Sequence, residues 1–183
     1  DLASDLVAAV EHGVLSLDAG RIGFTHDLLR ETALATARDL PSAHAAIAAA
    51  VERLGGTKAE LARRLAAAGD PRAAEVALDA GRRAARRGDD AEAAELLGLA
   101  LRALRASGEP TAEEVELAVE LGEALLRAGH VTEGSLRCAE AARLAHRVGA
   151  PDLVARAALA YGSVVRVGRV DPTLVELLED ALG

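Results

Sequence analysis

Residues 81–100 read GRRAARRGDDAEAAELLGLA, and this stretch decides the fold. It holds a glycine inside a predicted helix (Gly81), a glycine at a predicted turn (Gly88), and Leu97 and Ala100 in the next helix. A glycine in the middle of a helix costs roughly 1 kcal/mol relative to alanine, so its presence predicts close approach of a partner helix. The same order recurs twice, with the last turn glycine one residue short of register: Gly122, Gly129, Cys138 and Ala141, then Gly162, Gly168, Leu178 and Ala181.

Short breaks containing glycine separate the apolar stretches around these positions. Glycine supplies the left-handed conformation that ends a helix, while Asp or Thr at the cap and Pro in the first turn begin the next one. The pattern predicts seven helices in the second part of the chain: 57–68, 71–87, 90–106, 111–128, 131–148, 151–167 and 172–182.

The order of glycine, turn glycine, large apolar residue and alanine resembles the tetratricopeptide repeat, in which small residues lie where two antiparallel helices touch. Ala93 and Gly134 match the small position of the second helix. The spacing of 41 and 40 residues is longer than in that family, and apart from Tyr161 the aromatic positions hold Ala or Leu. HEAT-like repeats also fit the spacing. The predicted fold class is all-α, a helical-hairpin, tetratricopeptide-like solenoid.

The predicted helix 111–128 has a wide apolar stripe, as expected where a helix has neighbours on both sides. Its outer face carries five glutamates: Glu113, Glu114, Glu116, Glu120 and Glu123. In such an array the first helix of each hairpin forms the concave binding surface, here 71–87, 111–128 and 151–167. The polar or aromatic candidates to bind a protein partner or a small effector there are Arg83, Arg86, Glu120, Arg127, Arg156 and Tyr161.

The first 54 residues follow a different pattern. A helix over 2–12 precedes GVLSL and RIGFTH, two short runs that Asp18-Ala19-Gly20 joins into a predicted β-hairpin. A further helix begins near Thr25 or His26, and PSAHAAIAAAVERLGG predicts another. A helix and a hairpin form the closing half of a winged helix, with Phe24 as its expected core anchor. The predicted domains are 1–54, a winged-helix remnant with connecting helices, and 55–183, the repeats.

The hairpin and the repeats together resemble one region of large actinobacterial ATP-binding transcriptional regulators of the LuxR family. In these proteins a winged helix after the nucleotide-binding module ends in a segment similar to Phe24, His26, Leu28, Arg30 and Glu31, and tetratricopeptide-like repeats follow. LPSAHAAIAAAVE resembles the next helix of that family, with His44 at its histidine, whereas Arg64 stands where the family often has a histidine. The resemblance implies ATPase and DNA-binding domains elsewhere in a parent chain, since no phosphate-loop motif occurs here.

The composition of the chain limits the classes of function that we expect. The net charge of −8 argues against direct nucleic-acid binding, and no apolar run is long enough for a membrane span. A single cysteine fits a reducing compartment, so we expect a cytoplasmic location. The absence of methionine, even at position 1, suggests a piece of a longer protein. We expect no enzyme activity and no cofactor.

Two clusters have competing interpretations. His26 with Asp27 and Glu31 could form a metal or acid–base site, but neighbouring residues on a helix diverge, which favours a His26 that orders the strand-to-helix junction through backbone hydrogen bonds. The arginines at 82, 83, 86 and 87 favour a solvated or salt-bridged face. Cys138 is expected to be buried and inert. A small-ligand pocket among the helices and a self-association arm remain alternatives to partner binding.

Overall fold

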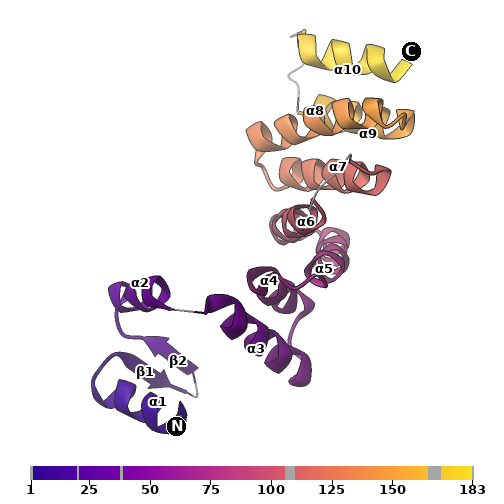
Figure 1. Cartoon of the computed structure of the whole chain (residues 1–183). Coiled ribbons are helices and arrows are strands. Elements are labelled where there is room, and N and C mark those ends of the chain that lie inside the picture. The colour runs from indigo at the N-terminus through magenta and orange to yellow at the C-terminus, as the bar shows by residue number, and fades with distance from the viewer. Residues whose placement is uncertain (1, 20, 38, 106–109, 165–169, 183) are drawn as a thin grey trace. The chain divides into compact units, whose positions relative to one another are not determined.

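The structure is a computed structural model that describes residues 2–19, 21–37, 39–105, 110–164 and 170–182 (Figure 1). These residues form ten helices and a two-stranded sheet, which agrees with the predicted all-α class and with the predicted β-hairpin near the N-terminus. The chain divides into two compact units, Asp1–Ala43 and His44–Gly183. The division falls near the start of α3 (Leu40–Arg53), before the predicted boundary at residue 54.

The first unit contains the predicted hairpin. Its elements are α1 (Leu2–Glu11), β1 (Leu15–Asp18), β2 (Arg21–Phe24) and α2 (Asp27–Thr36). The strands pair antiparallel from Leu15 opposite Phe24 to Asp18 opposite Arg21, and Ala19 in the turn has a positive φ of 48°. The Thr25 hydroxyl donates to the carbonyl oxygen of Gly13 at 2.6 Å and so ties the end of β2 back to the chain before β1.

No side chain in the described part of this unit is buried. Phe24, the expected core anchor, is 40% exposed, so that expectation is wrong. Leu28 and Val7 are exposed as well. The hairpin and its two short helices therefore leave their apolar side chains largely in contact with solvent.

The second unit contains all seven helices predicted after residue 57: α4 (Lys58–Ala68), α5 (Ala73–Arg87), α6 (Asp90–Leu104), α7 (Ala112–Arg127), α8 (Val131–Arg147), α9 (Pro151–Gly162) and α10 (Pro172–Leu182). Most ends agree with the prediction within two residues. The exception is α9, which was expected to reach residue 167 but ends at Gly162, with Ser163 and Val164 in a turn. Residues 165–167 lie outside the described residues.

Local capping explains these ends. Thr111 and Glu114 form a capping box at α7, in which each side chain accepts a hydrogen bond from the backbone N–H of the other residue. Gly88 and Gly129 have φ of 76° and 86°, a region that favours glycine. Their turns close with hydrogen bonds from Asp89 N to the Ala84 oxygen at 3.0 Å and from His130 N to the Leu125 oxygen at 2.9 Å.

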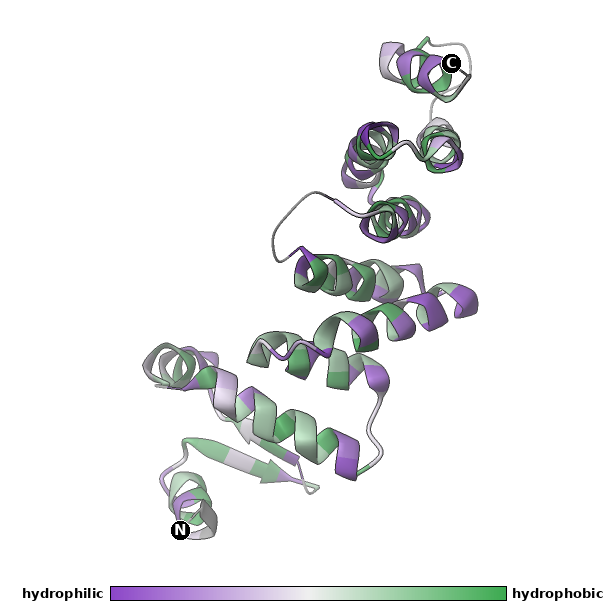
Figure 2. Ribbon diagram, turned by 45° about the vertical axis from the view of Figure 1, so that its right-hand side comes forward, coloured by the Kyte–Doolittle hydropathy of each residue, from purple (hydrophilic) through white to green (hydrophobic). Residues whose placement is uncertain are grey.

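From α4 onward each helix contacts the next one, and the next-but-one helices α4 with α6, α7 with α9, and α8 with α10 also pack together. Figure 1 shows these helices following one another in a stack, and in Figure 2 each carries both apolar and polar residues. The largest fully buried side chains between them include Leu96, Leu97, Leu117 and Val119. Alanine fills most other buried positions, which allows the helix backbones to approach closely.

The sequence predicts that each helix glycine packs against the residue sixteen positions further on. This contact forms at Gly81 and Gly122 but not at Gly162. A Cβ built on Gly81 would lie 3.0 Å from Leu97 Cγ, and one on Gly122 would lie 2.6 Å from Cys138 Sγ, both sixteen residues further on. Gly162 departs from this spacing, because its Cβ would meet Leu174 at 3.3 Å rather than Leu178. Correspondingly, Ala100 and Ala141 are fully buried, whereas Ala181 is only half-buried.

The physical reason for the departure is the early end of α9. The helices α5 and α7 continue past Gly81 and Gly122 by more than a turn, but Gly162 is the last residue of α9. The sequence predicted that Gly162 lies in the middle of a helix. This prediction is wrong, because Gly162 is the last residue of α9. The chain enters α10 from a different point, and the facing residue shifts by one helical turn, from Leu178 to Leu174.

Candidate functional site

An open groove of about 670 Å³ lies between α7 and α9. Leu126 and Leu159 are its two leucines: Leu126 is buried, whereas Leu159 is 69% exposed. Because Leu159 lies in a groove rather than alone on a flat surface, an apolar partner group could cover it there. The lining residues are Glu123, Leu126, Arg127, Asp152, Ala155, Arg156, Leu159, Ala160, Ser163 and Val164.

The periodicity of α9 explains why the groove forms there. Val154, Ala157 and Ala158 are buried, which fixes one face of the helix against the core. The groove residues from this part of the chain then fall into two adjacent rows with a spacing of four, 152–156–160–164 and 155–159–163. The buried face carries small residues, whereas the groove face carries Leu159, so the helix presents apolar atoms on both sides.

Paired charges connect the helices that border the groove. Arg156 on α9 donates two hydrogen bonds to the Glu123 carboxylate on α7, at 2.7 and 2.8 Å. Arg82 on α5 makes the same two-pronged contact with Glu120 on α7, at 3.0 and 2.8 Å. The hydrogen bond to Glu123 raises the pKa of Arg156, and the one to Glu120 raises that of Arg82. Planar guanidinium–carboxylate pairs fix orientation as well as distance.

The acidic face of α7 is only partly neutralised by these contacts. Four of the five predicted outer-face glutamates, Glu113, Glu116, Glu120 and Glu123, have spacings of three, four and three and so share one side of the helix. Glu116 reaches Arg156 Nη1 only at 4.0 Å. Glu114 is instead used in the capping box.

The structure places most of the partner-binding candidates in internal contacts. Arg83 pairs with Asp79 at 3.0 Å, Arg127 with Asp90 at 2.7 Å, and the Tyr161 hydroxyl donates to Asp171 at 3.1 Å. Arg156 and Glu120 join neighbouring helices as described. Arg86 has no ion pair among the described residues. Arg127 and Arg156 line the groove, and the other four candidates do not.

Sequence reasoning did not identify Leu126 and Leu159 as groove residues. Leu159 lies off the buried stripe that Val154, Ala157 and Ala158 define, and that signal is present in the sequence. For Leu126 no such signal exists, because it sits within the wide apolar stripe of α7. The pairing of Glu123 with Arg156, 33 residues apart, also depends on the tertiary arrangement.

The predicted cluster around His26 has a structural role at the junction of β2 and α2. His26 caps α2 through its backbone carbonyl, which accepts from Leu29 N at 3.1 Å, while its side chain makes no cap hydrogen bond. The backbone ties expected of its side chain come from Thr25 instead. Among the described residues no group of His, Cys, Asp and Glu could hold a metal ion. Cys138 is buried, as predicted, and its burial raises the pKa of the thiol to about 11.

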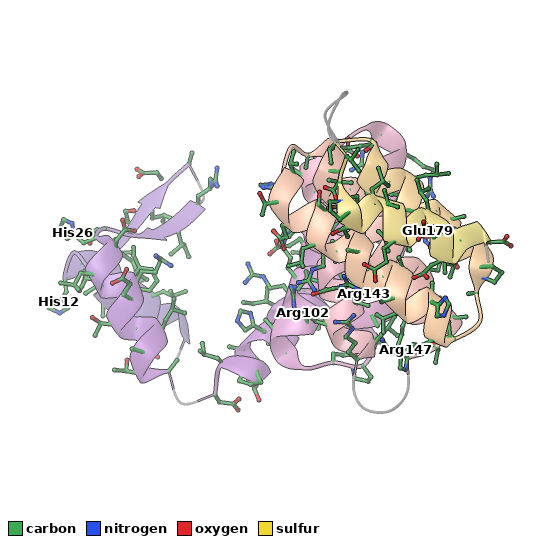
Figure 3. All side chains as sticks on the ribbon, turned by 90° about the horizontal axis from the view of Figure 1, so that it is seen from above. His12, His26, Arg102, Arg143, Arg147 and Glu179 are labelled. Atoms are coloured by element: carbon green, nitrogen blue, oxygen red, sulfur yellow. The ribbon has the colours of Figure 1, made fainter. Side chains whose placement is uncertain are left out.

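Three further arginines, Arg102 on α6 and Arg143 and Arg147 on α8, have no ion pair among the described residues (Figure 3). Arg102 and Arg147 lie in the last turns of their helices, where a cation interacts favourably with the helix dipole. A pocket of about 570 Å³ between α4 and α6 includes Arg102, together with the bonded pair Arg63 and Glu95. This pocket is more polar than the α7–α9 groove.

No protein-family model matches this chain, and neither a search of curated proteins nor one of solved structures found a match. Within the described ranges, none of the helices combines the length and the apolar composition that crossing a lipid bilayer requires.

Proposed function

We propose that this chain is the non-catalytic interaction arm of an ATP-dependent bacterial transcriptional regulator, and that it binds a protein partner in the groove between α7 and α9. The observation that carries the binding site is the open apolar groove around the exposed Leu159. The assignment to a cytoplasmic regulator of the LuxR family rests on the sequence resemblance from Phe24 through the repeats. In that parent, ATP hydrolysis and DNA binding belong to other domains.

The helix contacts support an array of helical hairpins. Contacts between successive helices, together with the next-but-one pairs, are typical of stacked repeats such as the tetratricopeptide class. Under this proposal α5, α7 and α9 are the first helices of three hairpins, and their row forms the binding surface. The groove then lies between two neighbouring helices of that row.

The paired charges favour a groove that exists before the partner arrives. Glu123 and Arg156 hold α7 and α9 together, and Arg82 and Glu120 hold α5 and α7 together. A surface that is already ordered loses less conformational entropy on binding, which raises affinity. Arg156 and Glu120, predicted as partner contacts, act in this proposal mainly as supports of the surface.

A small effector is the second candidate occupant. The groove volume of about 670 Å³ falls within the range of about 300–1,000 Å³ that is usual for small-molecule sites. The groove is open to solvent rather than enclosed, which favours a peptide segment over a small ligand.

Site-specific cross-linking tests the proposed site. The photo-reactive amino acid p-benzoylphenylalanine is introduced in place of Leu159, and in a control in place of Leu136, a 56% exposed leucine on α8 that is not part of the groove. In an extract of the native host we expect one discrete protein adduct from position 159 and none from position 136. Excess unmodified chain should compete for this adduct, and excess Leu159→Asp chain should not. Equal adducts at both positions, or competition by the variant, would count against the groove.

A further inference from the structure

The chemistry of the groove indicates the chemistry of its partner, and this step rests on the proposed binding function. We infer that the α7–α9 groove binds a peptide segment with apolar side chains and at least one lysine or arginine. The apolar part follows from the groove surface, and the basic part follows from the charges that remain after the internal pairs are formed.

Apolar side chains from both helices contribute to the site. Leu126 from α7 and Ala155, Leu159 and Ala160 from α9 line it, and Val164 extends it past the end of α9. In the free chain most of the surface of Leu159 is in contact with water. Covering this surface with leucine-like side chains removes it from water, which is the main favourable contribution to binding at such a site.

The charged residues of the groove are not equally available. Glu123 and Arg156 are bonded to one another through two hydrogen bonds, and Arg127 is bonded to Asp90 through Nε. Asp152 also lines the groove and has no ion pair among the described residues. A basic partner group can therefore pair with Asp152 without breaking an existing contact, whereas an acidic one would approach Arg156 or Arg127 beside the carboxylates of Glu123 and Asp90, which repel it.

The neighbouring face of α7 adds to this preference. Its four aligned glutamates face two guanidinium groups, those of Arg82 and Arg156, so negative charge is in excess before Asp152 is counted. Both arginines interact electrostatically with more than one of these glutamates. An excess of one sign beside a docking groove favours partners of the opposite sign and repels partners of the same sign.

Two short fluorescein-labelled peptides provide the test. They have leucines at the same positions, and they differ only in carrying lysines or glutamates at the same remaining positions. Fluorescence anisotropy measures their binding to the 183-residue chain at low ionic strength. We expect the lysine peptide to bind about tenfold or more tightly than the glutamate peptide, and this preference to shrink at about 0.5 M salt because the charges are then screened.

Variants separate the two parts of the inference. Leu159→Asp should weaken binding of the lysine peptide about tenfold, and Leu136→Asp on α8 should not weaken it. Asp152→Lys should remove most of the preference for lysine. Glu133→Lys is its matched control, because Glu133 is also an exposed acid in the first turn of a helix, α8. Circular dichroism establishes that each variant remains folded.

The outcomes distinguish this inference from the proposed function. Equal binding of both peptides, together with loss on Leu159→Asp, would overturn the charge preference and leave the groove as a docking site. Binding that Leu159→Asp does not change would overturn both. Failure of both peptides to bind would overturn the inference, while the cross-linking at position 159 would still test the groove.

Discussion

The hairpin of α7 and α8 and that of α9 and α10 begin from the same sequence spacing and end with different contacts. In the first, Gly122 lies against Cys138, and both are buried in the centre of the stack. In the second, Gly162 meets Leu174, and Leu178 at the equivalent spacing is 39% exposed. The difference shows that a repeated spacing specifies a contact only when the helix that carries it continues beyond the glycine.

The supporting contacts also differ between these hairpins. Arginine–carboxylate pairs join α5, α7 and α9, whereas α10 is joined to α9 by the hydrogen bond from Tyr161 to Asp171 and by apolar packing that buries Leu177. Asp171 in turn accepts from Thr173 N at 2.9 Å and Leu174 N at 3.2 Å at the start of α10. The α9–α10 hairpin should therefore tolerate changes that the hairpins α5–α6 and α7–α8 do not.

The largest expected effect on stability comes from truncating the leucine that lies sixteen residues after a helix glycine. Leu97→Ala should lower the free energy of unfolding by about 2–5 kcal/mol, because Leu97 is fully buried and its removal leaves a cavity. Leu178→Ala should cost less than about 1 kcal/mol, because Leu178 is partly exposed already. Urea denaturation followed by circular dichroism measures both. Equal losses would mean that the two hairpins pack alike.

Adding a methyl group at the central glycine should have the next largest effect. A Cβ at Gly122 would lie 2.6 Å from Cys138 Sγ and 3.2 Å from the Cys138 backbone nitrogen, so α7 and α8 must separate. Gly122→Ala should destabilise the chain by about 1–3 kcal/mol despite the higher helix propensity of alanine. If Gly122→Ala raises the melting temperature, the close approach of these two helices is wrong.

Alkaline pH should also weaken the α7–α8 contact through Cys138. Its pKa is raised to about 11 by burial, so the folded state disfavours the thiolate. The contribution to stability is complete below the unfolded pKa of about 8.5 and is lost as the pH rises through about 11. Urea titrations between these two pH values should show a larger loss in the free energy of unfolding for the unmodified chain than for the Cys138→Ala variant. Parallel pH profiles would contradict the assignment to Cys138.

A smaller effect is expected from the charge pair that borders the groove. A double-mutant cycle with Arg156→Gln and Glu123→Gln should give a coupling energy of about 1 kcal/mol, since both side chains are partly exposed. The pair of Arg137 and Glu140 on α8 is a matched control at 3.4 Å without a second hydrogen bond, and its coupling should be near zero. Equal couplings would show that the two-pronged geometry adds nothing.

The sequence predicted what local chemistry determines. Thr111 with Glu114, and the glycines at 88 and 129, set helix ends through contacts within a few residues, and those ends agree with the structure. The buried state of Cys138 followed from the spacing within a hairpin. The contact of Gly162 with Leu174 did not, because it depends on where α9 stops. Of the groove, the sequence predicted Arg127 and Arg156 on the two helices that border it, but not Leu126 and Leu159, since these require knowing which faces of α7 and α9 meet.

The smallest effect on stability is expected at Gly162, and it tests the difference between the two hairpins most directly. A Cβ there would meet only the side-chain tip of Leu174, at 3.3 Å from Cδ1, and a leucine tip can move where a backbone nitrogen cannot. Gly162→Ala should therefore change the free energy of unfolding by less than about 1 kcal/mol, with the gain in helix propensity offsetting the tighter contact. Thermal unfolding of Gly162→Ala beside Gly122→Ala measures this difference in one experiment. If both variants lose the same stability, Gly162 packs as deeply as Gly122, and the shift of one turn at α10 is refuted.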